Sequence, residues 1–193
     1  MPKSKATASQ VTPSLIRPVA LVGLMGSGKS SVGQRLAKAL RAAFVDADDE
    51  IKAASGLTIP EIFEQYGEGE FRALERRVMQ RLMTGPPQVI ATGGGAFMDP
   101  NTRHVIGEVA VSVWLRADLD VLVSRTAGRT HRPLLNAGDP REILTGLIDA
   151  RYPIYAQADV AVDSPSGISH ERMADKIIRA LKRHGQAFAP EVA

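Results

Sequence analysis

Short apolar runs alternate with longer amphipathic segments along most of the chain. The runs have the length and residue types of buried strands, and they lie at 19–22, 43–45, 89–92, 109–115 and 159–163. Apolar residues recur at helical spacing between them, which predicts helices at 31–40, 48–56, 58–67, 70–83, 118–124, 140–155 and 168–184. This alternation predicts an α/β domain of three layers, with a parallel sheet covered by helices on both faces.

Local signals support several of these helix boundaries. Acidic residues favour a helix start near Asp48, and Gly56 is expected to end that helix. The next helix should begin after Thr58, which is a plausible N-cap. Pro60 suits the first turn, and Glu61 completes a capping box with Thr58.

A glycine-rich loop joins the first predicted strand to the first predicted helix. Residues 23–30 read G-x-x-x-x-G-K-S, and strand, loop and helix are the context in which this pattern binds phosphate. Gly26 and Gly28 allow positive φ angles and close approach of an anion to the backbone. Lys29 would reach the β- and γ-phosphates of a nucleotide, and the Ser30 hydroxyl would be a ligand of Mg²⁺.

The composition is that of a globular protein with a full core. The chain has 193 residues, of which 44% are hydrophobic and 23% charged. Its net charge of +3 is too small to indicate nucleic-acid binding, although seven Lys or Arg and no acidic residue precede Asp46. Cysteine is absent, which excludes disulfides, thiolate zinc sites and a cysteine nucleophile.

The chain ends differ in character from the rest. Residues 1–17 are rich in Ser, Thr, Pro and Lys and lack a signal-peptide apolar region, so we expect a disordered tail. A single domain is expected over 18–184, with a frayed tail at 185–193. No apolar run approaches the roughly 20 residues of a membrane span. We therefore expect a cytoplasmic protein without membrane partners.

Two carboxylates follow the second predicted strand. Ligands of parallel α/β folds bind beyond the carboxyl ends of the strands, where Asp46 and Asp48 are expected. Such a pair can hold a metal-bound water and hydrogen-bond a hydroxyl group. Helix capping is the alternative role, but a phosphate site nearby already requires Mg²⁺.

Other candidate residues lie further along the chain. Arg72 and Glu75 are spaced as an i, i+3 ion pair, which alone would be unremarkable on a surface. Residues 93–95 are three consecutive glycines, suited to close contact between backbone and an anionic ligand. The loop 125–139 is rich in arginine and glycine and is expected to act as a mobile lid. Arg151 is a further cation near this loop, for which substrate contact and surface charge both stay open.

Together these motifs resemble shikimate kinase in their order and spacing. The resemblance covers residues 18–181 and rests on the glycine loop 23–30, Phe44-Val-Asp-Ala-Asp48, Ile62-Phe63 through Gly67-Glu68, Phe71-Arg72-Ala-Leu-Glu75, Thr92-Gly-Gly-Gly95, Arg132-Pro-Leu-Leu135 and Arg151-Tyr-Pro-Ile-Tyr155. Each motif is generic alone, whereas the full series is specific. It implies the fold of nucleoside monophosphate kinases, with a five-stranded parallel sheet in the order 2-3-1-4-5.

The resemblance also implies an activity and its substrates. Members of the family transfer the γ-phosphoryl group of ATP to the 3-hydroxyl of shikimate, giving shikimate 3-phosphate and ADP, in the chorismate route to aromatic amino acids. Mg²⁺ would be the metal and ATP the co-substrate, with no nucleic acid involved. The family is commonly monomeric, so a monomer is expected.

The resemblance assigns roles residue by residue. The implied catalytic residues are Asp48, as acceptor of the hydroxyl proton, with Lys29 and Arg132. The implied ATP-binding residues are Gly26, Ser27, Gly28, Lys29, Ser30, Ser31, Arg125, which stacks on adenine, and Arg132. The implied shikimate-binding residues are Asp48, Arg72, Gly94, Gly95 and Arg151. Glu75 would orient Arg72, Ser30 would be a metal ligand, and Asp46 would contact the metal through water.

One departure and two alternatives accompany this interpretation. Many members carry an adenine-contacting arginine after the fifth strand, where residues 163–167 have none, so Arg125 and backbone would hold adenine. A kinase of another small hydroxy acid such as gluconate is the first alternative, and the Asp-x-Asp, Phe-Arg-x-x-Glu and triple-glycine motifs argue against it. A regulatory nucleotide-binding module is the second, and the presence of Asp48 and Arg132 argues against it.

Overall fold

The computed structural model describes residues 14–127 and 138–190. Its centre is one parallel sheet in the order β2-β3-β1-β4-β5, as predicted. The strands are β1 (Val19–Val22), β2 (Ala43–Asp46), β3 (Gln88–Ala91), β4 (Val111–Arg116) and β5 (Val160–Asp163). The helices are α1 (Lys29–Leu40), α2 (Ala47–Ser55), α3 (Ile59–Met83), η1 (Ala96–Met98), α4 (Pro100–Val109), α5 (Leu119–Thr126), α6 (Pro140–Tyr155) and α7 (His170–His184).

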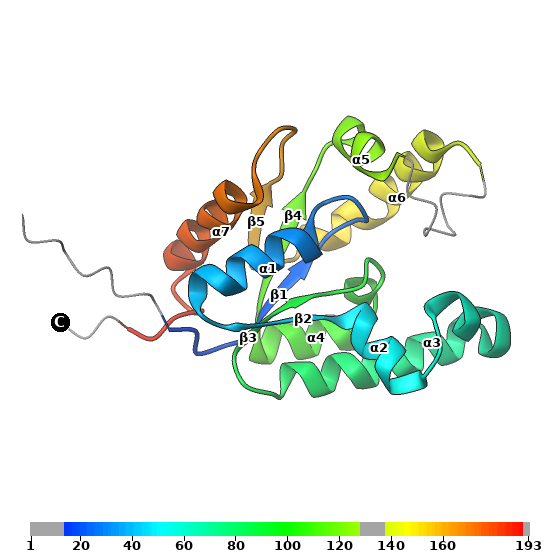
Figure 1. Cartoon of the computed structure of the whole chain (residues 1–193), viewed down its shortest axis with the longest axis horizontal. Coiled ribbons are helices and arrows are strands. Elements are labelled where there is room, and N and C mark those ends of the chain that lie inside the picture. The colour runs from blue at the N-terminus through cyan, green and yellow to red at the C-terminus, as the bar shows by residue number, and fades with distance from the viewer. Residues whose placement is uncertain (1–13, 128–137, 191–193) are drawn as a thin grey trace, which may run out of the picture.

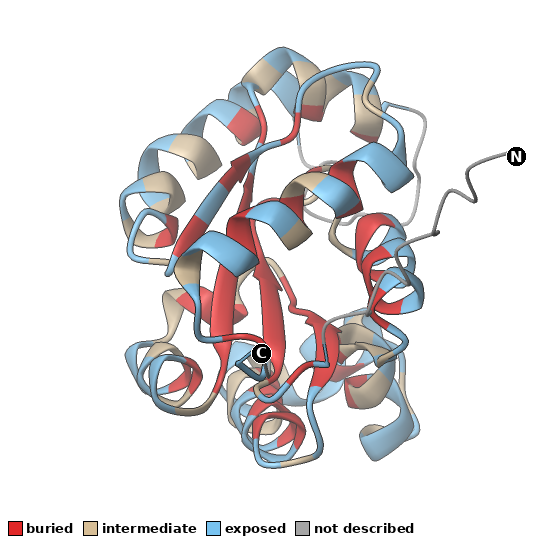
Figure 2. Cartoon of the chain, turned by 90° about the vertical axis from the view of Figure 1, so that its left-hand side faces the viewer, coloured by how far each residue is buried: buried red, intermediate tan, exposed pale blue. Residues whose placement is uncertain are grey.

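The sheet separates two apolar clusters, which confirms the three layers (Figure 1). Along β1, Val19 and Leu21 belong to the cluster that includes α1 and α7. Ala20 and Val22 belong to the other cluster, which includes residues of α2 to α6. Successive side chains of a strand point to opposite faces, so a fully apolar strand serves both cores. Figure 2 shows the buried strands between helices whose outer surfaces are exposed.

The predicted capping of α3 is confirmed. The Thr58 Oγ1 accepts a hydrogen bond from the Glu61 N–H at 3.4 Å, and the Glu61 carboxylate accepts one from the Thr58 N–H at 2.7 Å. The helix then changes direction at Gly67, which has φ 78° and ψ 176°. The predicted interruption between two helical segments is therefore present within α3, at a residue whose positive φ favours glycine.

Two helical elements were not predicted from the sequence, the short 3₁₀ helix η1 and the helix α4. Helix α4 begins after Asp99, whose carboxylate accepts a hydrogen bond from the Thr102 N–H at 2.8 Å. It extends to Val109, because the Ala110 N–H still donates to Ile106 O at 2.9 Å. The predicted start of the fourth strand at residue 109 is therefore wrong, and β4 begins at Val111.

The two ends of the described chain lie side by side (Figure 1). Leu15 and Phe188 form an antiparallel bridge, and both side chains are buried. The Ile16 N–H donates to Ala187 O at 3.0 Å, and the Ala189 N–H donates to Ser14 O at 3.1 Å. The inner parts of both predicted tails are thus packed on the domain, which extends beyond the expected limits. Residues 1–13 and 191–193, the outer parts of those tails, lie outside the described residues.

Within 14–127 and 138–190, no helix is both long enough and apolar enough to cross a membrane.

Candidate active site

The glycine loop connects β1 to α1 at the carboxyl edge of the sheet. Gly23, Gly26 and Gly28 have φ angles of 141°, 82° and 102°. Gly28 is the N-cap of α1, so the loop runs directly into the helix N-terminus. A Cβ atom on Gly23 would lie 2.9 Å from the backbone oxygen of Leu115. The predicted strand, loop and helix are present, with glycine where backbone angle or space requires it.

The first turn of α1 links this loop to β2. Lys29 Nζ donates hydrogen bonds to Gly23 O at 2.8 Å and Leu24 O at 3.1 Å, which folds the side chain over the loop. The Ser30 hydroxyl donates to Asp46 Oδ2 at 2.6 Å. Asp46 also caps α2, because its carboxylate accepts a hydrogen bond from the Asp48 N–H at 3.1 Å. The two residues predicted for the metal site, Ser30 and Asp46, therefore lie in direct contact, and Asp46 also has the capping role that was its alternative.

The Asp48 carboxylate lies in the first turn of α2, facing the turn that follows β3. Burial raises its pKa, and the negative charge of Asp46 raises that pKa further. The positive charge of Lys29 acts in the opposite direction. A Cβ atom on Gly93 would lie 3.0 Å from Asp48 Oδ1. A half-buried carboxylate with a raised pKa beside a lysine of the glycine loop can accept a proton from a nearby hydroxyl.

The ion pair of Arg72 and Glu75 is an internal feature of the site. Arg72 Nη1 lies 2.7 Å from Glu75 Oε2, and the Glu75 side chain is only 4% exposed. Arg72 also contacts Glu68 at 3.2 Å and lies over the ring of Phe71. Burial raises the pKa of Glu75, and the Arg72 charge opposes this shift. The surface-pair interpretation is excluded, since a buried carboxylate fixes the position of a partly exposed guanidinium.

Residues 93–95 form the turn around which the candidate side chains gather. A Cβ atom at Gly93 would lie 2.9 Å from Glu75 Oε1, and one at Gly95 would lie 2.4 Å from Arg72 Nη1. A Cβ atom at Gly94 would lie 3.5 Å from Arg151 Nη1 and 3.7 Å from Gly23 O. The turn thus lies against the substrate-site candidates and the glycine loop together, and a side chain at Gly93 or Gly95 would intrude on them.

Arg151 also bonds to this turn. Its Nη1 donates to Gly94 O at 3.1 Å, and the hydroxyl of Tyr155 donates to the same carbonyl. Both side chains come from α6, four residues apart and therefore on one face. Tyr155 is part of the motif Arg151-Tyr-Pro-Ile-Tyr155 but was given no role from the sequence, although its spacing from Arg151 was a usable signal.

Arg125, at the end of α5, is bonded to two loops. Its guanidinium donates to Ser164 Oγ at 2.8 Å and to Pro165 O at 2.9 Å, in the loop after β5. Longer contacts of 3.4 Å reach Gly26 O and Ser27 O. The Ser164 hydroxyl in turn donates to Ser27 O at 3.1 Å. The loop that lacks the expected arginine is thus tied to the glycine loop by Ser164, which sequence reasoning missed.

The remaining predictions concern the lid and the metal. Arg132 and most of the predicted lid, residues 128–137, lie outside the described residues. In the described part of the chain, no group of three or more His, Cys, Asp or Glu is placed to hold a metal ion. A metal here would thus depend on few protein oxygens.

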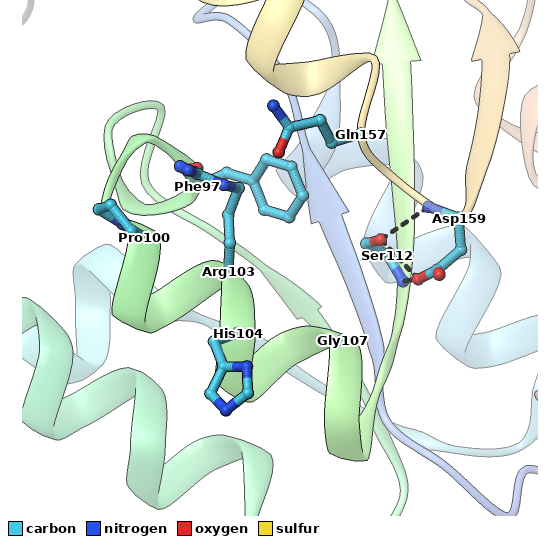
Figure 3. Close-up of a pocket in the computed structure, with 8 residues that line it drawn as sticks. All are labelled: Phe97, Pro100, Arg103, His104, Gly107, Ser112, Gln157 and Asp159. Carbon is cyan, nitrogen blue, oxygen red and sulfur yellow. Dashed lines mark hydrogen bonds between the residues drawn. The ribbon is translucent and has the colours of Figure 1, made fainter.

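One hollow in the described structure lies elsewhere (Figure 3). It has a volume of about 290 Å³ and lies between α4 and the amino ends of β4 and β5. Asp159 accepts hydrogen bonds from the N–H and hydroxyl of Ser112 at its wall, and Arg103 donates to the carbonyls of Phe97 and Met98. These polar groups bond within the wall of the hollow and stabilise it. The hollow lies at the amino ends of the strands, whereas the candidate site lies at their carboxyl ends, so the hollow is not assigned to that site.

Comparisons with known proteins agree with this geometry. A sequence model of the family described as shikimate kinase matches residues 25–182. A shikimate kinase of Paramagnetospirillum magneticum is 60% identical over 148 residues, covering 77% of this chain and 76% of the relative. The solved shikimate kinase from Acinetobacter baumannii in complex with shikimate has a TM-score of 0.84 and 34% identity, covering 88% of this chain and 95% of that one.

The gluconate alternative has a structural counterpart as well. A gluconokinase from Sinorhizobium meliloti has a TM-score of 0.60 and 19% identity, covering 88% of this chain and 94% of the other. At that identity the similarity concerns the fold alone. The comparisons therefore favour the first interpretation of the motifs over the alternative.

Proposed function

The chain belongs to the shikimate kinase family and is an ATP-dependent kinase, and we propose which of its residues hold each substrate. The reaction is transfer of the γ-phosphoryl group of ATP to the 3-hydroxyl of shikimate, which gives shikimate 3-phosphate and ADP for aromatic amino acid synthesis. The glycine loop binds the phosphates of ATP, through Gly26, Ser27, Gly28 and the residues Lys29, Ser30 and Ser31 of the first turn of α1.

One observation carries the assignment of the second substrate. Three consecutive glycines each lie against a different side chain: Gly93 against Asp48, Gly94 against Arg151 and Gly95 against Arg72. Two guanidinium groups and two carboxylates therefore surround a single turn, and of the carboxylates Glu75 is already paired with Arg72. Shikimate is a small anion with a carboxylate and a row of hydroxyls. The guanidinium groups suit the carboxylate, since arginine can bind it through two parallel hydrogen bonds, and Asp48 suits the hydroxyls.

The positions of the charged groups support a separate role for each of them. The carbonyl of Gly23, where the glycine loop begins, is close to Gly94, so the two substrates would meet between these segments. Asp48 accepts the proton of the attacking hydroxyl, and Lys29 leaves the loop carbonyls to bind the transferred phosphoryl group. Arg132 adds positive charge there, and Glu75 keeps Arg72 in position. The protein need take little covalent part in the reaction, because positioning and charge neutralisation dominate the catalysis of phosphoryl transfer.

The proposed metal is Mg²⁺. The 2.6 Å hydrogen bond between Ser30 Oγ and Asp46 Oδ2 places two oxygen atoms side by side next to Lys29. Oxygen is the ligand type that Mg²⁺ prefers, and this ion usually keeps several waters and phosphate oxygens. Ser30 would bind it directly and Asp46 through a water. When bound, the ion neutralises charge on the phosphate oxygens.

Adenine would be held by Arg125 and by the backbone of the loop after β5. Arg125 already bonds to Ser164 and Pro165 of that loop, which supports this arrangement. The planar guanidinium can stack on the base.

We also propose a cytoplasmic monomer. Among the described residues, the large apolar side chains that are exposed are Ile16, Phe63 and Tyr66, which make no extended apolar face. A molar mass near 20.7 kDa in light scattering would support the monomer, and twice that value would contradict it.

A steady-state assay of ADP formation tests the function. The protein is incubated with ATP and Mg²⁺, with shikimate, with gluconate or with neither. We expect ADP formation that depends on shikimate and stays at background with gluconate. Shikimate-independent turnover, or a preference for gluconate, would refute the proposal.

A further inference from the structure

Tyr155 is the last residue of α6 and is fully buried. Its ring packs among three other aromatic rings, those of Phe97, Trp114 and Tyr152, at centroid distances of 6.2 to 6.4 Å. The ring is thus fixed by contacts that do not involve its hydroxyl. The hydroxyl points out of this cluster and donates a hydrogen bond to Gly94 O.

Gly94 O therefore accepts two hydrogen bonds, one from Tyr155 and one from Arg151. A carbonyl oxygen has two lone pairs, so both donors can be accommodated. The donors differ in freedom, since the tyrosine ring is enclosed whereas Arg151 is a long side chain at the edge of the site. Arg151 has five N–H donors, and its bond to the turn uses one of them.

The two donors of Gly94 O matter when the substrate binds, because Arg151 must then leave this carbonyl. A carboxylate competes for Arg151, because a charge-assisted pair is stronger than a bond to a neutral carbonyl. If Arg151 were the sole partner of Gly94 O, its departure would leave the carbonyl of a partly buried residue without a protein hydrogen bond. A carbonyl left without a hydrogen bond raises the free energy of the substrate-bound state, and this cost opposes the movement of Arg151.

We propose that Tyr155 is a positioning residue that holds the Gly94 carbonyl so that Arg151 is free to bind the shikimate carboxylate. This inference rests on the proposed role of Arg151. Tyr155 touches neither substrate in this account. It keeps the glycine turn in place, and its hydrogen bond means that Gly94 O still has a donor when Arg151 moves. Burial raises the pKa of Tyr155 to about 12 against the opposing charge of Arg151, so the hydroxyl remains a donor at any pH used for assays.

The test is Tyr155→Phe, with Tyr152→Phe as the matched control. Both changes remove one hydroxyl from the same helix and the same aromatic cluster, and the Tyr152 hydroxyl donates to Ala117 O instead. For Tyr155→Phe we expect the KM and the directly measured Kd of shikimate to rise about 3- to 10-fold, the effect of one neutral hydrogen bond. The KM of ATP and kcat should stay within about 2-fold. Tyr152→Phe should leave the shikimate constants unchanged.

A double-mutant cycle separates positioning from general stability. In an Arg151→Ala background, Tyr155→Phe should add less than about 2-fold to the shikimate KM, because there is no longer an arginine to release. The Tyr155→Phe effect should also be constant from pH 6 to pH 9. An unchanged shikimate KM, an equal loss for both substrates, the same factor in both backgrounds, or loss of folding in Tyr155→Phe would each overturn the inference.

The outcome for Arg151→Ala alone distinguishes two kinds of failure. If this variant loses shikimate affinity and Tyr155→Phe does not, the role of Tyr155 is wrong and the proposed site stands. If Arg151→Ala keeps full shikimate affinity, the assignment of Arg151 fails, and the role of Tyr155 fails with it.

Discussion

Replacing Gly95 by alanine should weaken shikimate binding without strain in the backbone. Gly95 has φ −96° and ψ −17°, which alanine adopts readily. The added Cβ would lie 2.4 Å from Arg72 Nη1, 2.8 Å from Nη2 and 2.9 Å from Cζ, whereas ordinary contact begins at 3.4 Å. The guanidinium must therefore move by about 1 Å, from 2.4 Å to at least 3.4 Å, away from its present position.

The size of the effect follows from what Arg72 does. It is held by the buried Glu75 at 2.7 Å, so a displaced guanidinium either lengthens this bond or turns away from the substrate. A hydrogen bond to a charged group contributes about 1.5–3 kcal/mol, which corresponds to roughly a 10- to 150-fold rise in the KM of shikimate. Because Arg72 is far from the glycine loop in sequence and bonds to none of its residues in the described structure, the KM of ATP should change by less than about 2-fold.

The assay is steady-state ADP formation with each substrate varied in turn. Gly107→Ala is the control, because a Cβ atom there meets no heavy atom within 4 Å and the residue lies in α4, away from the site. Both variants should remain folded, as judged by thermal melting. A Gly95→Ala enzyme with the KM of the unchanged protein for shikimate would refute the placement of Arg72 in the substrate site.

Three further predictions concern the chemical step and the nucleotide. Asp48→Asn should lower kcat by about 10²- to 10⁴-fold, the usual contribution of a positioned base, while the Kd of ATP measured by calorimetry stays nearly the same; unchanged kcat would contradict the role of Asp48. Activity should fall as the pH decreases through the pKa of Asp48, because the acceptor must be ionised, and this loss should occur above the range of an ordinary aspartate, since burial and Asp46 raise that pKa. Asp46→Asn should move this acid limb of the pH–rate profile to lower pH, and a limb that stays in place would show that another group titrates. Arg125→Ala should raise the KM of ATP and leave that of shikimate within about 2-fold, because its partners Ser164 and Pro165 belong to the proposed adenine side; a larger effect on shikimate would reverse this assignment.

The sheet and the glycine loop were predictable because their signals are local. A buried parallel strand is a short apolar run, and the anion-binding loop is a fixed pattern between such a run and a helix. Helix α4 was missed although Asp99 and Pro100 are N-terminal signals. Its buried face is small, with Thr102 and Ile106 as the buried residues, so it shows little hydrophobic periodicity.

The arrangement of the site could be predicted only in part. The i, i+3 spacing of Arg72 and Glu75 predicts an ion pair, but both side chains also lie against residues 93–95, which belong to the turn after β3. The bond of Arg125 to Ser164 joins residues 39 positions apart, and nothing near either one indicates it. Packing between distant segments decides these features, and one sequence does not contain that information in a local pattern.

A crystal structure of the protein with ADP, Mg²⁺ and shikimate is the most direct test of the site. The account predicts the shikimate carboxylate within hydrogen-bond distance of Arg72 and Arg151, and its 3-hydroxyl beside Asp48, facing the end of the ADP phosphates at Lys29. The Gly94 carbonyl should keep its bond to Tyr155 in that complex. Shikimate bound with its hydroxyls toward the two arginines, or bound away from residues 93–95, would contradict the account.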